Sequence, residues 1–408
     1  MSLISIEILR EEGIEKMDIV ASLVIYISTF TSSLYSFKCA IYNKEKYPKK
    51  IVKFILWSII GILIPCLLAA FRDYSVGVDT ENYAVNIVSL AAHTHNFQLV
   101  YLNNGGGTEL LYVLLIYIVT FFTSEGALVL FLLQMLSIVP VFIAAVKLRN
   151  KMSVLLVMGT YFFMFYNNSL NLCKQSIACS FLLLAVSYLY VEDAEKYKKI
   201  KSLSCILLAI MFHKATLYGI AIIFICRWVS KTNKRIFLRM IIYVCIVMFP
   251  VILKYFINLM TALGILSERF VNYVNIFGVN GNSSEYNINP FSPYFMIEIC
   301  LRVLLISVPL LLYRKSKNDR MIKFLRLTQI LGLLMYIIIL FEMRISYGQR
   351  ISMFLDYFAI LFIPYSAHNW RICSKVQKNI LVYFLLFVYW FVWIVLLGWS
   401  GSGIYKFR

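Results

Sequence analysis

Long apolar runs, separated by short polar segments, cover most of the chain. The clearest runs lie at about 18–37, 52–71, 127–146, 172–191, 236–258, 296–313, 324–342 and 379–398, and shorter ones at about 109–123, 152–166 and 351–366. Runs near 20 residues match the roughly 30 Å hydrocarbon core of a bilayer, whereas strands of a membrane barrel would alternate polar and apolar residues. The pattern therefore predicts an all-α, polytopic integral membrane protein with about 10–12 transmembrane helices, including partial or re-entrant ones.

Clusters of lysine and arginine between the apolar runs indicate the orientation. They fall within 38–50, 196–201, 227–239, 314–320 and 371–378. Short loops rich in positive charge stay in the cytoplasm. Two segments conflict with a chain that crosses the membrane at every apolar run. Full crossings by 109–123 and by 203–226 would put basic loops outside. We therefore expect 109–123 not to cross fully and 203–226 to form a hairpin of two half-helices broken at His213.

Residues 1–408 are then expected to form a single transmembrane domain with about ten full crossings and both termini outside. Two substantial loops, 72–108 and 259–295, would lie on the outer side. The first 17 residues mix acidic and basic side chains, which differs from the basic start of a cleaved signal peptide. No internal repeat and no separate soluble domain is visible in the sequence.

Composition narrows the class of protein. Hydrophobic residues make up 61% of the chain and charged residues 14%, which is too few to cover a water-soluble surface. A net charge of +19 would indicate nucleic-acid binding in a soluble protein. Here the positive-inside rule accounts for that charge, so no nucleic-acid partner is expected. The nine cysteines include no C-x-x-C pair, and we expect most of them to be small buried hydrophobic residues.

The densest polar patch, 71–83, opens at the outer end of an apolar run. Arg72 offers a forked cation suited to phosphate. Asp73 and Asp79 offer carboxylates, and Gly77 permits a tight turn between them. The alternative is an ordinary solvated loop with an arginine at the membrane interface.

Two further patches place ionisable residues at or inside apolar runs. Lys174 and Gln175 would enter the membrane on the first turn of a helix, and charges at that depth usually mark function. The alternative is a lysine that reaches back to the interface. His213 and Lys214 interrupt another run, where the alternative is a histidine hydrogen-bonded within the bundle. No second histidine stands at ligand spacing, so no metal site is expected.

A fourth patch lies at 342–350, again expected on the outer side. Arg344 and Arg350 would suit an anionic lipid head group or a pyrophosphate, and Asp356 and Tyr357 follow in the next apolar run. Anchoring at the interface is the alternative. No P-loop, G-x-S-x-G, H-E-x-x-H or dinucleotide-binding glycine pattern is present, which disfavours an ATP-driven pump and a soluble-type hydrolase.

Taken together, these blocks resemble the EpsG-like family of Wzy-type polymerases, which act on bacterial O-antigen, capsule and exopolysaccharide. Arg72, Gly77, Asp79 and Tyr83 are similar to the R-x-x-x-x-G-x-D-x-x-x-Y block of that family.

The later blocks follow in the family order over roughly residues 52–366. The segment 171–178 resembles N-x-x-R-Q-x-x-A, with Lys174 where an arginine is expected. The segment 212–215 is similar to F-H-K-S, with Ala215 in place of the serine. Arg350 and Tyr357 resemble a late element that carries an arginine and a tyrosine.

The resemblance implies a GT-C-like glycosyltransferase at the outer face of the bacterial cytoplasmic membrane. It would move a growing glycan from undecaprenyl pyrophosphate onto a sugar hydroxyl of a new lipid-linked repeat unit. No cofactor is needed, because the lipid carries the activation. Expected partners are the undecaprenyl-pyrophosphate-linked oligosaccharide, membrane lipid, a chain-length regulator and a flippase.

Under this reading, cations would stabilise the pyrophosphate leaving group, and a base would take the proton of the acceptor hydroxyl. The candidate bases are Asp79, Asp73 and His213. The candidates for binding substrate are Arg72, Tyr83, Lys174, Gln175, Arg344, Arg350 and Tyr357.

Two alternatives remain open. One is an O-antigen ligase or another lipid-linked glycosyltransferase, which would share the fold class, the membrane side and the cations. The other is a transporter or flippase of lipid-linked sugars, for which charges lining a path and paired repeats with broken helices would be expected.

Overall fold

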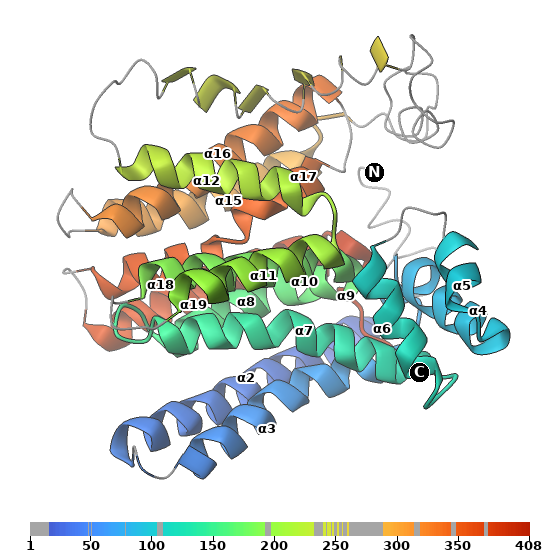
Figure 1. Ribbon diagram of the computed structural model, residues 1–408. Coiled ribbons are helices and arrows are strands. Elements are labelled where there is room, and N and C mark those ends of the chain that lie inside the picture. Colours follow the sequence, from blue (N-terminus) through green and yellow to red (C-terminus); the bar gives the residue numbers. More distant parts are fainter. Residues whose placement is uncertain are drawn as a thin grey trace.

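A computed structural model gives the architecture (Figure 1). It describes residues 16–47, 49, 51–77, 79–103, 109–191, 197–231, 240–241, 243–245, 247–248, 251–252, 255, 259–260, 289–313, 319–343, 348–370 and 374–408. Eight helices in these ranges are long and apolar enough to cross a membrane. The expected all-α, polytopic architecture is thereby confirmed. The predicted run at 236–258 falls largely outside the described residues.

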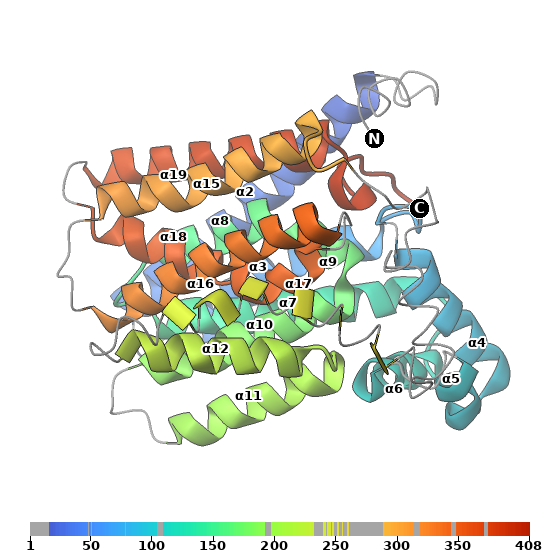
Figure 2. The same cartoon turned by 90° about the horizontal axis from the view of Figure 1, so that it is seen from above.

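One bundle, whose longest helices run back and forth between its two ends, contains most of the described helices (Figures 1 and 2). They are α2 (Lys16–Lys46), α3 (Ile51–Ala70), α7 (Gly126–Lys147), α8 (Val154–Tyr161), η2 (Phe162–Tyr166), α9 (Asn167–Asn171), α10 (Cys173–Tyr190), α11 (Lys198–Phe212), α12 (Thr216–Lys231), α15 (Pro293–Leu312), α16 (Arg320–Ile338), η3 (Ile339–Met343), α17 (Gly348–Asp356), α18 (Ala359–His368), α19 (Lys375–Trp390), η4 (Phe391–Leu396) and η5 (Trp399–Gly401). Four short helices lie beside one end: η1 (Glu81–Val85), α4 (Asn86–Thr94), α5 (Phe97–Asn103) and α6 (Leu110–Thr120).

The basic loops gather at one end of the bundle. Lys151 donates a hydrogen bond to the carbonyl oxygen of Tyr190 at 2.6 Å, which joins the loop after α7 to the end of α10. The Arg227 guanidinium lies 5.0 Å from the ring centre of the same tyrosine. Lys201 lies 5.8 Å from the ring of Tyr188. The end of α10, the start of α11, the last turns of α12 and the residue Lys151 after α7 therefore meet at the end expected to face the cytoplasm.

The segment between α3 and α7 leaves and returns at the opposite end. A Cβ added at Gly126, where α7 begins, would lie 2.9 Å from the Tyr74 hydroxyl, just after α3. Glu125 also pairs with Arg408 at 3.0 Å. Tyr117 of α6 donates to the carbonyl oxygen of His95 at 2.9 Å, so α6 packs on the short helices beside it. As expected from the charge pattern, 109–123 does not run the length of the bundle.

The hairpin expected within 203–226 is also present. Helix α11 ends at Phe212 and α12 begins at Thr216, with His213 extended between them (φ −159°, ψ 109°). The two helices are longer than the predicted half-helices, at 15 and 16 residues. Lys198 begins α11 and Lys231 ends α12, so these two residues lie at one end of the pair of helices and the break at His213 lies at the other.

The C-terminal tail is tied into the bundle. The carbonyl oxygen of Ser402 accepts hydrogen bonds from the Tyr26 hydroxyl at 2.6 Å and from Asn167 Nδ2 at 2.9 Å. Tyr405 donates to the carbonyl oxygen of Leu68 at 2.7 Å. The tail thus crosses the ends of α2, α3 and α9 and closes the end of the bundle opposite the basic loops.

Candidate functional site

Arg72 lies beneath the surface of the protein rather than on it. Its backbone forms an antiparallel bridge with Phe407 of the tail, and the residue is only 1% exposed. One guanidinium nitrogen donates to the carbonyl oxygen of Leu170 at 2.8 Å and to the Thr80 hydroxyl at 3.2 Å. Arg72 therefore fastens the loop after α3 to the end of α9.

Gly77 is placed where a side chain would not fit. Its φ is +92°, a region that favours glycine. An added Cβ would lie 2.8 Å from the Thr80 hydroxyl and 3.0 Å from the Leu170 carbonyl oxygen. That carbonyl is the one that accepts from Arg72. The glycine of this block thus lets the loop close tightly on α9.

Asp79, two residues further on, lies at the end of α9. The Asp79 backbone N–H donates to Asn171 Oδ1 at 2.7 Å. Its carboxylate accepts from Arg350 of α17 at 2.7 Å. Gln175 donates to the backbone oxygen of Arg350, which holds α17 against α10. The Arg350 side chain keeps 37% of its surface exposed, so this cation is within reach of a ligand.

A second group meets the same turn of α10 from the other side. Glu109, directly before α6, accepts from His213 Nδ1 at 2.8 Å and pairs with Lys174 at 3.2 Å. Burial raises the pKa of Glu109, but the hydrogen bond from His213 and the charge of Lys174 outweigh it and lower the pKa to about 2. The carboxylate is therefore ionised at neutral pH. Lys174 also lies 5.3 Å from the ring centre of Tyr112.

Residues from four distant stretches thus converge on one turn, 171–175. Arg350 and Lys174 supply cations, Asp79 and Glu109 supply carboxylates, and His213 supplies an imidazole. Helices α6, α9 and α17, at or beside which the cluster lies, are found at the end of the bundle away from the far ends of α10 and α12 (Figure 1). Such a set can bind a phosphate-bearing group and accept a proton beside it.

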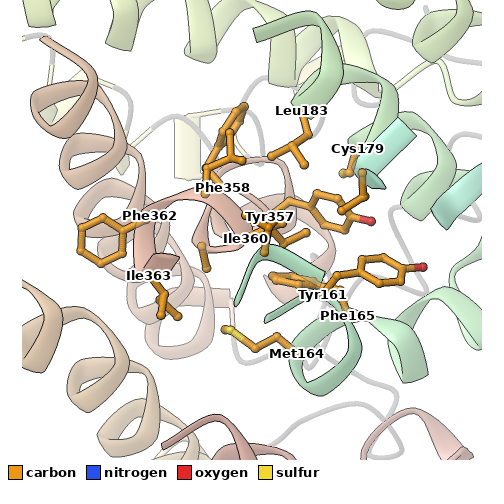
Figure 3. Close-up of a cluster of buried hydrophobic side chains, with 14 of the residues drawn as sticks. Tyr161, Met164, Phe165, Cys179, Leu183, Tyr357, Phe358, Ile360, Phe362 and Ile363 are labelled. Atoms are coloured by element: carbon orange, nitrogen blue, oxygen red, sulfur yellow. The ribbon is translucent and has the colours of Figure 1, made fainter. Parts of the chain in front are cut away.

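Two candidates from the sequence lie apart from this cluster. Asp73 Oδ1 accepts from the N–H and hydroxyl of Ser75, at 2.9 and 2.6 Å, in a local turn beside the tail. The hydrogen bonds from Ser75 lower the pKa of Asp73. Tyr357 is 1% exposed, bonds to the Ser180 hydroxyl at 2.7 Å and packs in the hydrophobic cluster of Figure 3. Arg344 and the side chain of Tyr83 lie outside the described residues.

Sequence reasoning missed Glu109 and a second polar group. Arg302 pairs with Glu298 at 2.8 Å and with Asp356 at 2.7 Å, deep between α15, α16 and the end of α17. Tyr336 also donates to Glu298. The signal for this group was available, because Glu298 and Arg302 stand four residues apart inside an apolar run. In the described ranges, no three His, Cys, Asp or Glu side chains are grouped so as to hold a metal ion.

Comparison with known proteins places this geometry in a family. No curated protein and no solved structure matches the chain. A family model described as the EpsG family matches residues 54–408, a range that contains every member of the cluster around 171–175. The blocks that carried the resemblance in the sequence supply every member of the cluster except Glu109. The chain therefore belongs to the EpsG family.

Proposed function

We propose that the chain is a Wzy-type polysaccharide polymerase that uses a lipid-linked donor. Membership of the EpsG family supports a polysaccharide polymerase in general terms. The donor that we propose is a growing glycan on undecaprenyl pyrophosphate, and the acceptor is a sugar hydroxyl of a lipid-linked repeat unit. The bundle is accordingly proposed to be of the GT-C kind.

One observation carries the proposal: cations, carboxylates and an imidazole from distant stretches converge at one end of a membrane bundle. Arg350 is partly exposed, and Lys174 lies at the start of α10 beside Glu109. Charge develops on the pyrophosphate as its bond to the sugar breaks, and fixed cations lower the energy of that state most effectively. We assign Arg350 and Lys174 to the pyrophosphate. Arg72, which bonds to Leu170 and Thr80, we assign to holding the loop that carries Asp79.

The proposed reaction can be written with these side chains and the two substrates. The acceptor hydroxyl loses its proton to a base, and its oxygen forms a bond to the anomeric carbon of the donor. The bond between that carbon and the pyrophosphate oxygen breaks, and the pyrophosphate leaves with the electron pair. The proton ends on solvent or on the released pyrophosphate. Asp79 is paired with Arg350, which makes His213 the better candidate for the base.

The orientation supports a reaction outside the cytoplasm. The basic loops lie at the other end of the bundle, and the positive-inside rule puts them in the cytoplasm. We propose that the chain lies in the bacterial cytoplasmic membrane with the cluster on its outer face. A chain-length regulator and a flippase are its proposed partners.

One observation favours a second candidate, a flippase or transporter. Glu298, Arg302 and Asp356 form an ion cluster deep in the bundle, and ionisable residues at that depth often mark a translocation path. The larger polar cluster, in contrast, lies at one end. The polymerase therefore remains our first proposal.

Deletion and restoration of the gene in its native host would separate these functions. We expect loss of the gene to reduce a ladder of surface glycan to single attached repeat units, and the restored gene to return the ladder. Loss of all attached glycan while lipid-linked polymer accumulates would identify a ligase instead. Accumulation of lipid-linked units on the cytoplasmic face alone would identify a flippase.

A further inference from the structure

We propose that Glu109 is a positioning residue that holds His213 as the general base and Lys174 as a pyrophosphate-binding cation. This inference rests on the proposed function and adds to it a residue outside the blocks that carried the resemblance. Glu109 is 8% exposed and stands at the junction of three elements, α6, α10 and the break between α11 and α12.

The two carboxylate oxygens of Glu109 have separate partners. Oε1 accepts from His213 Nδ1 at 2.8 Å, and Oε2 lies 3.2 Å from Lys174 Nζ. Glu109 occupies the N-cap position of α6, yet its side chain makes no capping hydrogen bond to that helix. The Glu109 carboxylate therefore bonds to residues of other helices and not to α6 itself. In this way it fixes the distance between the imidazole of His213 and the amine of Lys174.

The ring of His213 is held in position from two directions. Besides the bond to Glu109, it stacks on Phe354 of α17, with ring centres 6.2 Å apart and planes 17° apart. A neutral imidazole that donates from Nδ1 presents a lone pair at Nε2, on the side of the ring away from the carboxylate. Charged groups around the ring are Glu109 from the α6 side, Lys174 from α10 and the neighbouring Lys214, while α17 contributes an uncharged ring.

This geometry defines a step in the transfer. Nε2 of His213 takes the proton of the acceptor hydroxyl while the hydroxyl oxygen bonds to the anomeric carbon. The carboxylate of Glu109 stabilises the imidazolium that forms and does not itself take the proton. Lys174, held by the other oxygen of Glu109, faces the charge that develops on the departing pyrophosphate. The proton then passes to solvent or to that pyrophosphate.

The test uses membrane vesicles that contain the full-length protein and lipid-linked repeat units extracted from a host deleted for the gene. We compare Glu109→Gln, Glu109→Asp, His213→Ala and the double variant Glu109→Gln/His213→Ala. The matched control is Glu125→Gln, a glutamate at the same end of the bundle that is exposed and paired only at the surface with Arg408. Protein amount and melting temperature in each membrane preparation show whether a variant folds.

We expect Glu109→Gln to lower kcat by about 10²-fold or more, in the range lost with general-base catalysis. We also expect the acid limb of its pH–rate profile to move to lower pH, because the imidazolium loses its carboxylate partner. Glu109→Asp keeps the charge and should recover part of the rate. If Glu109 acts through His213, the double variant should be no slower than His213→Ala alone.

Three results would overturn the inference: a normal rate for Glu109→Gln, an unmoved acid limb, or losses that multiply in the double variant. A structural ion pair that only fastens α6 would lower the melting temperature and leave the acid limb in place. If the wild-type protein and Glu125→Gln make no polymer from these units, the proposed function fails instead. The two failures are therefore distinguishable.

Discussion

Arg350 and Arg72, two candidate arginines near the cluster, differ in what surrounds them. Arg350 is partly exposed and faces one carboxylate, whereas Arg72 is buried against a backbone oxygen and a hydroxyl. We expect Arg350→Ala to abolish polymer in the host while the amount and melting temperature of the protein stay near those of the wild type. Surface-glycan gels and immunoblots of the membranes measure both. A normal ladder from Arg350→Ala would contradict the assignment.

Arg72→Ala should lower the stability of the folded protein. It removes the guanidinium that donates to Leu170 and Thr80, and losing a hydrogen bond from a charged group costs about 1.5–3 kcal/mol. The Leu170 oxygen keeps only the longer hydrogen bond from Thr80, at 3.3 Å, and the weak one from Cys173. We predict a lower melting temperature in detergent than for Arg350→Ala, with loss of polymer following from the displaced Asp79. A stable Arg72→Ala protein without polymer would instead indicate that Arg72 contacts substrate.

Gly77→Ala tests whether the glycine of the block is needed for space. The left-handed backbone alone costs roughly 1–2 kcal/mol for an alanine, and the Cβ would also press on the Leu170 oxygen. Gly398→Ala is the matched control, because its φ is +64° and no other atom lies within 4 Å of the added Cβ. We expect the melting temperature to fall further for Gly77→Ala. Equal falls would show that space at Gly77 does not matter.

At the scale of elements, α17 is fixed at both of its ends. Arg350 near its start pairs with Asp79, and Asp356 at its end pairs with Arg302, which also holds Glu298 of α15. The buried cluster thus sets the position of the helix that carries the exposed cation.

Arg302→Met should therefore destabilise strongly. It leaves two carboxylates without their partner, and breaking a buried pair from one side costs about 3–5 kcal/mol. Removing the charges of Glu298 and Asp356 as well, as Gln and Asn, should recover much of the melting temperature. The same fall in the single and the triple variant would show that the loss of stability does not come from the two unpaired carboxylates.

The sequence predicted helices better than it predicted contacts. Hydropathy and the basic clusters located the long helices, the lateral α6 and the break at His213, because each depends on the preference of a segment for lipid or water. The pairing of Glu109 with His213 joins residues 104 positions apart, and no periodic pattern in the sequence indicates it. Tyr357 illustrates the converse, since its resemblance to a late family element made it a candidate for binding substrate, whereas its ring is buried among apolar side chains.

At the scale of the whole molecule, the polarity of the two ends is itself testable. In a background whose nine cysteines are replaced, we would introduce single cysteines at Lys151, Lys231 and Glu125. A membrane-impermeant thiol reagent added outside should label Glu125→Cys and neither of the other two. Labelling of Lys231→Cys from outside would contradict the hairpin at His213 and the outer location of the cluster.

The most direct test of the proposed function is reconstitution. Purified protein in liposomes would be given repeat units linked to undecaprenyl pyrophosphate, and the products would be followed by gel and by release of free undecaprenyl pyrophosphate. We predict a ladder of two or more units, with one carrier lipid released for each bond formed, and neither product from Arg350→Ala. Intact wild-type protein that leaves the units unjoined, or moves them across the bilayer without joining them, would contradict the proposal.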